Sequence, residues 1–460
     1  MSLTKVSYSM VKGSSYNVLD YGAVGNGIVD DTNAIKAAMT AASALGKRLF
    51  FPAGIYLVTD SLDMCQYTNI FGEYNYQGSN DSTNNQSTII QFSPTSAKSL
   101  FVASSSNGTS AGGFRSFISI DSIAIFGNST TSTGNSIVAI DANQVIYSSF
   151  RNLKIWNFRT GIWCRQTIGN KFDNIQFGYE YLSCILYTGS TPTTDNWTQC
   201  YIAGPYTPIG VDASSSNAID IRFNNCTFES LVNYGVKMAK ECSSWSFTNC
   251  YSEDVPSSHA ATDAMFRVGY EGTANPVTPS LCVFGGIYNN GASVSGIWMD
   301  VDEVYSVKIY GAHIVQFDKI IRYTANTFPN AVSLFGNSCQ AFNTFFNGPA
   351  GKFNGIFGQH ALNNGDGNIQ QLRVRDVTAE GIYSPNAILY IGDGSTCRMG
   401  SAGLAVVPLV GSSQDLGAMP NYRWNEIHAT IGLTLITPDL SKTYRISIDN
   451  AGAVITTLVP

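Results

Sequence analysis

Two phrases of the sequence match each other 24 positions apart, at residues 222–229 and 246–253. They read RFNNCTFE and SFTNCYSE, and in each an Asn-Cys pair is followed by a glutamate three positions after the cysteine. A repeat of roughly 20–50 residues is typical of a solenoid, in which every coil stacks on the one before it. Neighbouring strands lie about 4.8 Å apart, so equivalent residues of successive coils are expected to stack at that spacing.

The alternation of side chains along a strand separates the cysteine of each phrase from the glutamate. Cys226 and Glu229 are three positions apart in the sequence and therefore face opposite sides. If the cysteine side is the core, Glu229 and Glu253 stand side by side on the outside. Cys200, Cys226 and Cys250 fall at equivalent positions, so we expect all three to be buried and reduced, as small apolar core residues.

The composition favours an all-β protein with a large core. The chain has 460 residues, of which 44% are hydrophobic and 13% charged, with 43 Gly, 24 Tyr and 25 Phe, which is typical of many short strands and turns. A net charge of −6 and the lack of any Lys/Arg run longer than two residues argue against a nucleic-acid partner. No apolar segment near the start is typical of a signal peptide, and none approaches the ~20 residues of a membrane span, so we expect neither.

The first 60 residues carry the most specific motifs. A helix is expected to begin at Asp31 or Thr32 and to end at Gly46, with strands on either side of a Pro-Ala-Gly turn at 52–54. Several phrases here resemble the opening of pectate-lyase-like right-handed parallel β-helix proteins, and of bacteriophage tailspike polysaccharide depolymerases in particular. They are NVLDYGA at 17–23, GNG at 25–27, DDT at 30–32, AI at 34–35 and FPAG-x-Y at 51–56. Asn26 departs from the aspartate that many relatives have.

The resemblance implies a fold and a function. The fold is all-β, a right-handed parallel β-helix with an N-terminal capping helix and a small C-terminal β domain. The function is that of a homotrimeric depolymerase of the virion tail, which binds and cleaves a capsular or O-antigen polysaccharide of a bacterial host and contacts other phage tail proteins. Two alternatives stay open, a lyase that cleaves a uronate-containing capsule by β-elimination, and a non-catalytic polysaccharide-binding spike or adhesin.

We expect three segments, which are an N-terminal stub with capping strand and helix at 1–60, the β-helix at 61–347, and a linker with a small β domain for trimerisation or carbohydrate binding at 348–460. Within the β-helix the repeat steps are mostly 22 to 26 residues, apart from an insertion at 255–280. Insertions in solenoids commonly lie on one face, often the binding face. Tyr444–Ile448 and Val454–Val459 are expected to pair as a terminal hairpin.

Two stacked carboxylates are the main catalytic candidates. Glycoside hydrolysis needs a proton donor and a second carboxylate, ~5–5.5 Å apart in retaining and ~6.5–9.5 Å apart in inverting enzymes. Glu229 and Glu253 on neighbouring coils meet this need, with Asp254 as a spare second partner. The competing interpretation is that these acids are only solvated, or form ion pairs with Lys237, Lys240 or Arg222.

Aromatic residues are expected beside the acids. Tyr201, Tyr251 and Tyr288 each come one position after the repeated cysteine or its expected equivalent. Outward rings there would stack on sugar rings or line a trimer interface. Trp156 and Trp197 are assigned either to this strip or to the core.

A lyase would need a base and a cation that neutralises a uronate. Tyr251, His259, Lys237 and Arg267 are candidates, and His259 is the best of them because it lies in the insertion. We therefore expect His259, Lys237 and Arg267 among the substrate-binding residues. The sequence has no His/Cys cluster at metal-ligand spacing and no phosphate-binding glycine loop, so no metal or organic cofactor is expected.

Overall fold

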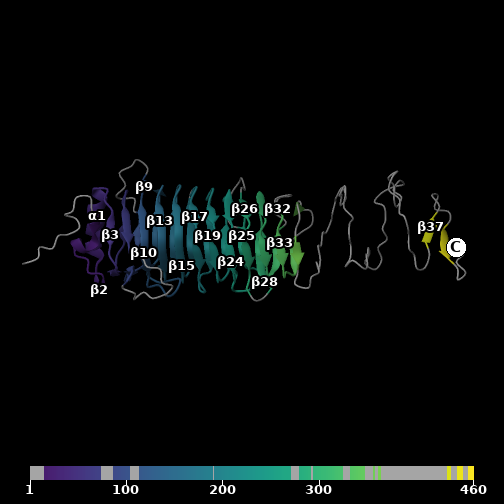
Figure 1. Ribbon diagram of the computed structural model, residues 1–460, viewed down its shortest axis with the longest axis horizontal. Helices are drawn as coiled ribbons and strands as arrows, with labels where there is room; N and C mark the ends of the chain where they lie inside the picture. Colours follow the sequence, from purple (N-terminus) through teal and green to yellow (C-terminus); the bar gives the residue numbers. More distant parts are fainter. Residues whose placement is uncertain are drawn as a thin grey trace, which may run out of the picture. The chain divides into compact units, whose positions relative to one another are not determined.

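The structure is a computed structural model that describes residues 15–73, 86–103, 113–189, 191–270, 279–291, 294–324 and 332–347, together with 356–357, 361–363, 433–436, 443–448 and 454–459. The chain divides into two compact units, 1–378 and 379–460. The first is a stack of parallel β-coils (Figure 1). No helix in these described ranges is long and apolar enough to cross a membrane.

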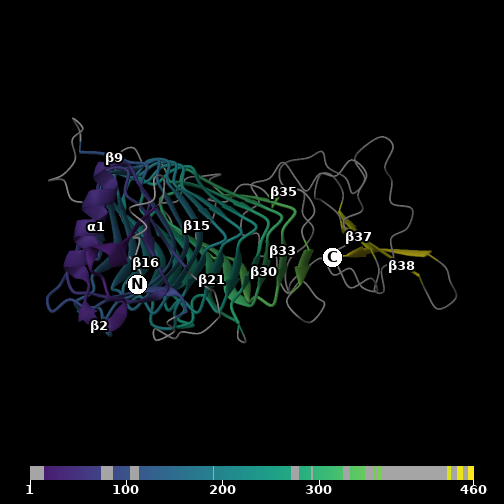
Figure 2. The same cartoon turned by 60° about the vertical axis from the view of Figure 1, so that its left-hand side comes forward.

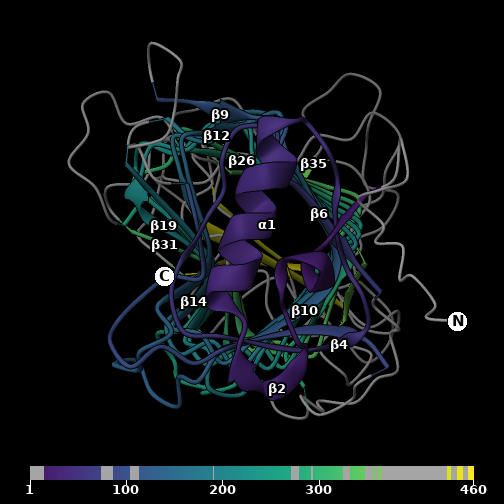
Figure 3. The same cartoon turned by 90° about the vertical axis from the view of Figure 1, so that its left-hand side faces the viewer.

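Helix α1, Thr32–Ala44, closes the N-terminal end of the stack. Its residues Ile35, Ala38 and Ala42 follow helical spacing and are buried in the core. Gly46, at φ +60°, follows the last turn. Figure 3 shows α1 lying across the end of the coils, so the predicted capping helix is confirmed. The elements around it are β1 Tyr16–Asn17, the 3₁₀ helix η2 Val18–Tyr21, β2 Asn26–Asp30, β3 Leu49–Phe51 and β4 Gly54–Val58.

Two parallel sheets run along the stack, which confirms the predicted parallel β-helix (Figure 2). The longer sheet has 23 strands, and each central coil adds two of them. After β1 to β4 its strands are β6 Asn69–Gly72, β7 Thr88–Phe92, β10 Ser119–Phe126, β13 Ser149–Trp156, β15 Lys171–Gly178, β17 Asn196–Thr198, β18 Tyr201–Ala203, β20 Arg222–Asn224, β21 Thr227–Glu229, β23 Trp245–Thr248, β24 Tyr251–Glu253, β26 Ser280–Phe284, β27 Ile287–Asn289, β29 Ser306–Tyr310, β30 His313–Val315, β32 Val332–Phe335, β33 Ser338–Gln340, β35 Ile356–Phe357 and β36 Ala361–Asn363.

The second sheet has 11 strands. They are β5 Leu62–Asp63, β8 Phe101–Val102, β11 Val138–Asn143, β14 Thr160–Arg165, β16 Ser183–Gly189, β19 Ile209–Ser216, β22 Tyr234–Met238, β25 Ala264–Val268, β28 Ser295–Val301, β31 Phe317–Tyr323 and β34 Thr344–Asn347. A short pair, β9 Arg115–Ser116 and β12 Val145–Ile146, lies outside both sheets. The apolar faces of the two sheets enclose one continuous core.

A residue in the left-handed conformation bends each central coil within the longer sheet. Asn152, Asn174, Asn225 and Asn249 occupy this position with φ between +49° and +54°, a region that asparagine and glycine adopt more readily than other residues. The repeated Asn-Cys pair arises because the asparagine makes the bend and the cysteine then points inward. In the next coil Gly285, at φ +63°, takes the same position, where a Cβ atom would lie 2.7 Å from Asn249 Oδ1.

This bend corrects one expected position. Because Gly285, the first of two consecutive glycines, replaces Asn249, the residue that pairs with Tyr251 is Ile287 and not Tyr288. Tyr288 pairs with Ser252 and is fully buried in the core. The prediction that Tyr288 faces outward to bind sugar is therefore wrong by one position.

The three repeated cysteines lie in the core. Cys200, Cys226 and Cys250 are at most 1% exposed, and all three are free thiols. The Cys226 thiol donates to the carbonyl oxygens of Trp197, one coil before, and of Asn224 at 3.6 Å each. Burial raises the pKa of the Cys226 thiol well above its ordinary value. The expectation of buried, reduced cysteines is confirmed.

Asp195 is fully buried and connects neighbouring coils. Its Oδ2 accepts a hydrogen bond from the Thr167 hydroxyl at 2.6 Å, and its Oδ1 accepts one from the Asn170 backbone N–H at 3.0 Å. The Tyr187 hydroxyl lies 3.4 Å from Oδ2 and accepts a hydrogen bond from Trp197 Nε1 at 2.8 Å. Burial is the main cause that raises the pKa of Asp195 to about 6 from its ordinary 3.8, against the hydrogen bonds that lower it.

Asp195→Asn is expected to change how stability depends on pH. Because the pKa is higher in the folded protein, folding binds this proton, so the stabilisation is complete below about pH 4 and is lost as the pH rises to about 6. The loss amounts to about 3 kcal/mol. Asparagine is neutral at every pH. Between pH 4 and 8, the free energy of unfolding measured in urea should therefore decrease less for the variant than for the wild type. Parallel profiles for the two proteins would contradict this prediction.

The C-terminal unit contains a small antiparallel sheet. Its strands are β37 Leu433–Ile436, β38 Thr443–Ile448 and β39 Val454–Val459. Strands β38 and β39 pair in antiparallel register, which confirms the predicted terminal hairpin. Most of 348–460 lies outside the described residues, and its assignment to trimerisation or carbohydrate binding stays a prediction.

Candidate functional site

The register of β18, β21 and β24 brings the two glutamates together. Ala203 pairs with Glu229, and Glu229 pairs with Glu253, so the three residues form one outward column across adjacent coils. Strand spacing in a sheet separates their backbones by about 4.8 Å. The predicted stacking of Glu229 on Glu253 is therefore confirmed, while their catalytic roles stay a prediction.

A tyrosine holds each glutamate. The Tyr201 hydroxyl donates to Glu229 Oε2 at 2.6 Å, and the Tyr251 hydroxyl donates to Glu253 Oε2 at 2.7 Å. The pKa of Tyr251 rises to about 12, chiefly because its hydroxyl bonds to the Glu253 carboxylate, with smaller contributions from burial and from the charges of Glu253 and Glu229. Tyr251 thus remains a hydrogen-bond donor near neutral pH and lies within the field of both acids.

The ion pairs considered for these acids do not form. Lys240 binds Glu303 at 2.9 Å, and Arg222 binds Asp220 at 2.8 Å. Lys237 lies on β22 in the second sheet, where it is paired in register with Arg267 of β25. The structure therefore does not bring Lys237 or Arg267 to the glutamates.

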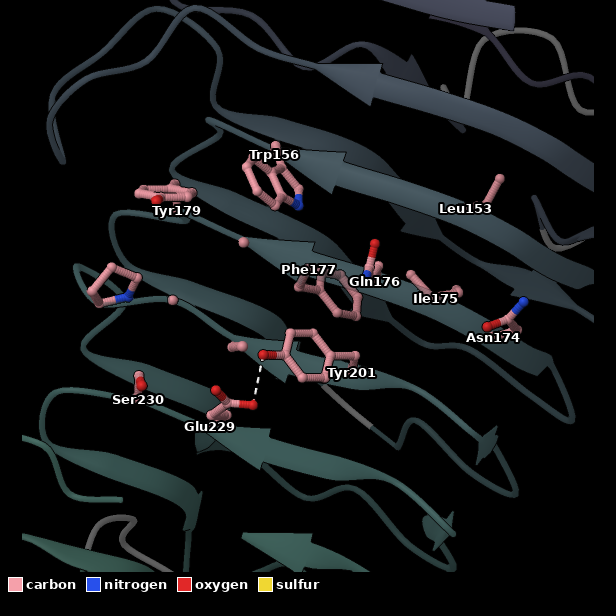
Figure 4. A pocket seen from close by; sticks show the side chains of 14 residues that line it. Leu153, Trp156, Asn174, Ile175, Gln176, Phe177, Tyr179, Tyr201, Glu229 and Ser230 are labelled. Carbon is pink, nitrogen blue, oxygen red and sulfur yellow. Dashed lines mark hydrogen bonds between the residues drawn. The ribbon is translucent and has the colours of Figure 1, made fainter. Parts of the chain in front are cut away.

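A groove of about 730 Å³ opens on the outer face of the longer sheet, and of the two glutamates only Glu229 lines it (Figure 4). Trp156 pairs with Gly178 on the next coil, and Ala203 precedes Glu229 in the same outward column. Two coils with small outward residues thus lie between the backbone positions of Trp156 and Glu229, and the indole covers Gly178, where a Cβ atom would lie 2.7 Å from the ring. The hollow exists because Gly178 leaves room for the indole and the small Ala203 does not fill the space between the ring and Glu229.

Three tyrosines extend the wall that Trp156 forms. The ring centres of Trp156 and Tyr179 are 5.0 Å apart, those of Tyr179 and Tyr206 are 5.8 Å apart, and Tyr181 stacks on Tyr206 at 6.4 Å. Tyr206 is 60% exposed. Offset and tilted rings at these separations attract one another, so the four side chains form a continuous aromatic surface at the edge of the groove.

Trp156 also brings polar groups to this surface. Its indole Nε1 is buried and has no acceptor among the described residues. The Lys154 ammonium lies 4.3 Å from the centre of the Trp156 ring, within the range of a cation–π interaction. Burial lowers the pKa of Lys154. A ligand in the groove would meet an aromatic face and the carboxylate of Glu229.

Asp254 and His259 lie together beyond the end of β24. His259 Nε2 is 3.4 Å from Asp254 Oδ1, and His259 Nδ1 is 2.7 Å from Ser295 Oγ. Neither residue lines the groove. Within the described ranges, no three His, Cys, Asp or Glu side chains come together in an arrangement that would bind a metal.

Sequence reasoning left Trp156 undecided and missed Tyr179 and Tyr206. The step from β13 to β15 contains the signal, because it aligns Trp156 with Gly178, and a glycine beside an outward tryptophan marks a place where that ring lies over the next coil. Tyr206 lies in a loop of irregular length and follows no repeat. Trp197 is fully buried in the core.

A family model described as rhamnogalacturonase A/epimerase, pectate lyase-like, matches residues 15–260, more than half of the chain. The chain belongs to this family. The rhamnogalacturonase A/epimerase family is pectate lyase-like, as the N-terminal phrases predicted, and the match includes the groove, Glu229 and Glu253.

Solved structures share the fold at low sequence identity. The surface adhesin PfbA of Streptococcus pneumoniae is 14% identical with a TM-score of 0.54, over 76% of this chain and 91% of that one. A tailspike protein mutant of E. coli bacteriophage HK620, in complex with a pentasaccharide, is 12% identical with a TM-score of 0.54, over 78% and 68%. A glucan 1,3-beta-glucosidase of Cochliobolus carbonum is 37% identical over 73 residues, 16% of this chain and 9% of that protein. The chain thus spans under a tenth of this curated relative.

Proposed function

We propose that the chain binds and cleaves a bacterial surface polysaccharide, capsular or O-antigen, by glycosidic hydrolysis, as a depolymerase of a phage tail. The observation that carries this proposal is the groove that both the Trp156–Tyr179 surface and the Glu229 carboxylate line, with the small Ala203 between them. Aromatic faces stack on sugar rings, and a carboxylate pair supplies the groups that hydrolysis needs. The similarity to a tailspike that binds a pentasaccharide is consistent with this proposal.

In the proposed reaction one glutamate protonates the leaving oxygen and the other acts as nucleophile or base. The backbone spacing of about 4.8 Å between stacked residues is close to the ~5–5.5 Å carboxylate separation of retaining enzymes. Tyr201 and Tyr251 orient the two carboxylates through hydrogen bonds of 2.6 and 2.7 Å. Asp254, the next residue after Glu253, is the alternative second acid.

Hydrolysis is favoured over β-elimination by the positions of the residues that the sequence suggested for a lyase. Lys237 and Arg267, the cations expected for a lyase, lie on the second sheet, and Arg267 is bound to the buried Asp300 at 3.1 Å. The acids Glu229 and Glu253 lie on the longer sheet with the groove. His259, the candidate base, does not line the groove.

A non-catalytic spike is the second candidate function. The hydrogen bonds from Tyr201 and Tyr251 favour it, because they fix both carboxylates in place, and carboxylates fixed in this way can serve as binding groups without reacting. The fold similarity to a protein described as a surface adhesin agrees with it. Incubating the protein with a panel of purified capsular and O-antigen polysaccharides separates the candidates, because new reducing ends indicate hydrolysis, absorbance of an unsaturated uronate indicates a lyase, and binding without either indicates a spike.

Trp156→Ala is expected to weaken polysaccharide binding by at least about tenfold, because it removes the main aromatic wall of the groove. Titration calorimetry with the polysaccharide that the wild type binds measures the dissociation constants of wild type and variant. Trp163→Ala is the matched control, because Trp163 is on β14 of the second sheet, where it donates to Thr188 Oγ1 at 2.7 Å. Equal affinities of the two variants would move the binding site away from the groove.

We also propose that the protein is a homotrimer in the virion tail, in contact with other tail proteins. The C-terminal coils carry exposed apolar side chains, among them Phe284 at 41% and Ile287 at 48%. Phe284, Tyr310 and Phe335 stack as an outward aromatic ladder with ring centres 5.2 and 4.6 Å apart. Association would remove such surface from water. Light scattering at micromolar concentration should give a trimer mass, and a monomer mass would contradict the proposal.

A further inference from the structure

A serine, a histidine and an aspartate form a connected chain outside the groove. Ser295 Oγ lies 2.7 Å from His259 Nδ1, and His259 Nε2 lies 3.4 Å from Asp254 Oδ1. With the proton on Nε2, the ring nitrogen nearer Asp254, Nδ1 is the acceptor for the serine hydroxyl. This is the arrangement of nucleophile, base and orienting acid that activates a serine.

The loop that carries His259 is held by its own backbone. Ser257 and Ser258 donate backbone N–H bonds of 2.8 and 2.9 Å to carbonyl oxygens of the preceding coil, and the His259 N–H donates to the Pro256 carbonyl. The Ser258 hydroxyl in turn donates to Asp263 Oδ2 at 2.7 Å. His259 therefore projects from a bound turn, at φ +52°, a conformation that surrounding structure must hold in place.

The serine is positioned from the other side. Asn290, fully buried, donates from Nδ2 to the Ser295 carbonyl at 2.6 Å and to its Oγ at 3.1 Å. A Cβ atom at Gly296 would lie 2.8 Å from Pro256 Cγ, so the residue after the serine packs closely against the histidine loop. The side chains of His259 and Asp254 are 39% and 37% exposed. The Ser295–His259–Asp254 relay, as we call this chain of side chains, is therefore open to a substrate.

We propose that Ser295, His259 and Asp254 form a second catalytic site that hydrolyses acyl esters of carbohydrate hydroxyl groups. Ser295 Oγ bonds to the carbonyl carbon while its proton passes to His259 Nδ1. The bond from that carbon to the alcohol oxygen breaks, and the alcohol leaves with this proton. Water then attacks the acyl-serine, gives a proton to His259 and releases the carboxylic acid, and the proton returns to Ser295.

The ester class follows from the position of the relay. Asp254 directly follows Glu253, so an acylated glycan on the longer sheet would pass close to the serine. His259 Nε2 and Asp254 Oδ1 are 3.4 Å apart, and catalytic contacts of this length commonly shorten into hydrogen bonds when substrate binds. The relay uses neither Glu229 nor Glu253, so ester cleavage and glycosidic cleavage are separable by mutation.

The test uses the full chain with p-nitrophenyl acetate and with a fluorophosphonate that labels activated serines. The wild type should hydrolyse the ester with saturation kinetics and take up the label at Ser295, as mapped by mass spectrometry. Ser295→Ala and His259→Gln should each lower kcat/KM by about 100-fold or more. Glu241→Gln, in the turn after β22, should leave ester hydrolysis unchanged.

A second serine–histidine pair provides the matched control. His313 Nδ1 lies 3.1 Å from Ser338 Oγ, but no carboxylate among the described residues pairs with this histidine. Ser338→Ala should therefore leave ester hydrolysis and labelling unchanged. If Ser295→Ala fails to fold, His259→Gln still tests the proposal, because the exposed His259 can be replaced without opening the core. Absence of label at Ser295, or equal ester rates in wild type and His259→Gln, would overturn it.

Discussion

Glu229→Gln is expected to reduce the release of reducing ends from the polysaccharide by about a thousandfold, and Glu253→Gln by a similar factor. Glutamine keeps the shape of the side chain and still accepts a hydrogen bond, so the contacts from Tyr201 and Tyr251 remain. It can neither donate a carboxylic proton nor act as nucleophile or base. Binding should persist, because stacking on Trp156 does not depend on these charges.

The measurement is a reducing-end assay on the purified polysaccharide, with binding followed in parallel by calorimetry. Glu241→Gln is the matched control, because Glu241 lies in the turn after β22, away from the groove. The expected phenotype is a protein that binds the polysaccharide and cleaves it very slowly. If both glutamine variants cleave at nearly the wild-type rate, the stacked acids are a solvated face, and Asp254 becomes the next acid to replace.

Trp197→Ala is expected to lower the free energy of unfolding by about 3–5 kcal/mol. Trp197 is fully buried, and its ring stacks on Phe172 with centres 3.8 Å apart and on Phe223 with centres 6.0 Å apart. The change leaves a cavity across three coils and removes the indole donor to the Tyr187 hydroxyl, which lies beside Asp195. The buried network around Asp195 therefore loses a partner as well.

Urea unfolding followed by near-ultraviolet circular dichroism measures this loss. Trp163→Ala is the control of equal size, because Trp163 is only half-buried on the outside of β14 and should cost much less. A similar loss of stability in both variants would show that the stacked rings do not contribute more than an outward tryptophan.

The repeat predicted the central coils because local and tertiary requirements coincide there. An asparagine that tolerates a left-handed conformation is followed by an inward cysteine, and Glu229 then points outward with its equivalent Glu253. The prediction failed where the bend residue changed identity. At Gly285 two consecutive glycines meet the same backbone requirement, so the sequence alone did not show which of them replaces Asn249.

The groove was harder to predict because it is formed by the space beside small side chains and not by the side chains themselves. Gly178 and Ala203 matter only because they lie between Trp156 and Glu229 in one outward column, and this becomes visible only when the coils are aligned. Tyr206 contacts Tyr179 in the aromatic surface, but it lies in a loop that does not follow the repeat. His259 was noticed as a loop histidine, but its contact with Ser295 joins residues 36 positions apart that belong to different coils.

The column from Trp156 to Glu229 makes the length of the groove a whole number of coils. Each coil adds about 4.8 Å along the stack, and a coil contacts chiefly its two neighbours. Gain or loss of one complete coil between Trp156 and Glu229 would move the aromatic wall relative to the acid by that fixed step, with inward and outward positions unchanged. A lineage of such chains can thus adjust the span of glycan it accommodates in discrete steps while the core remains the same.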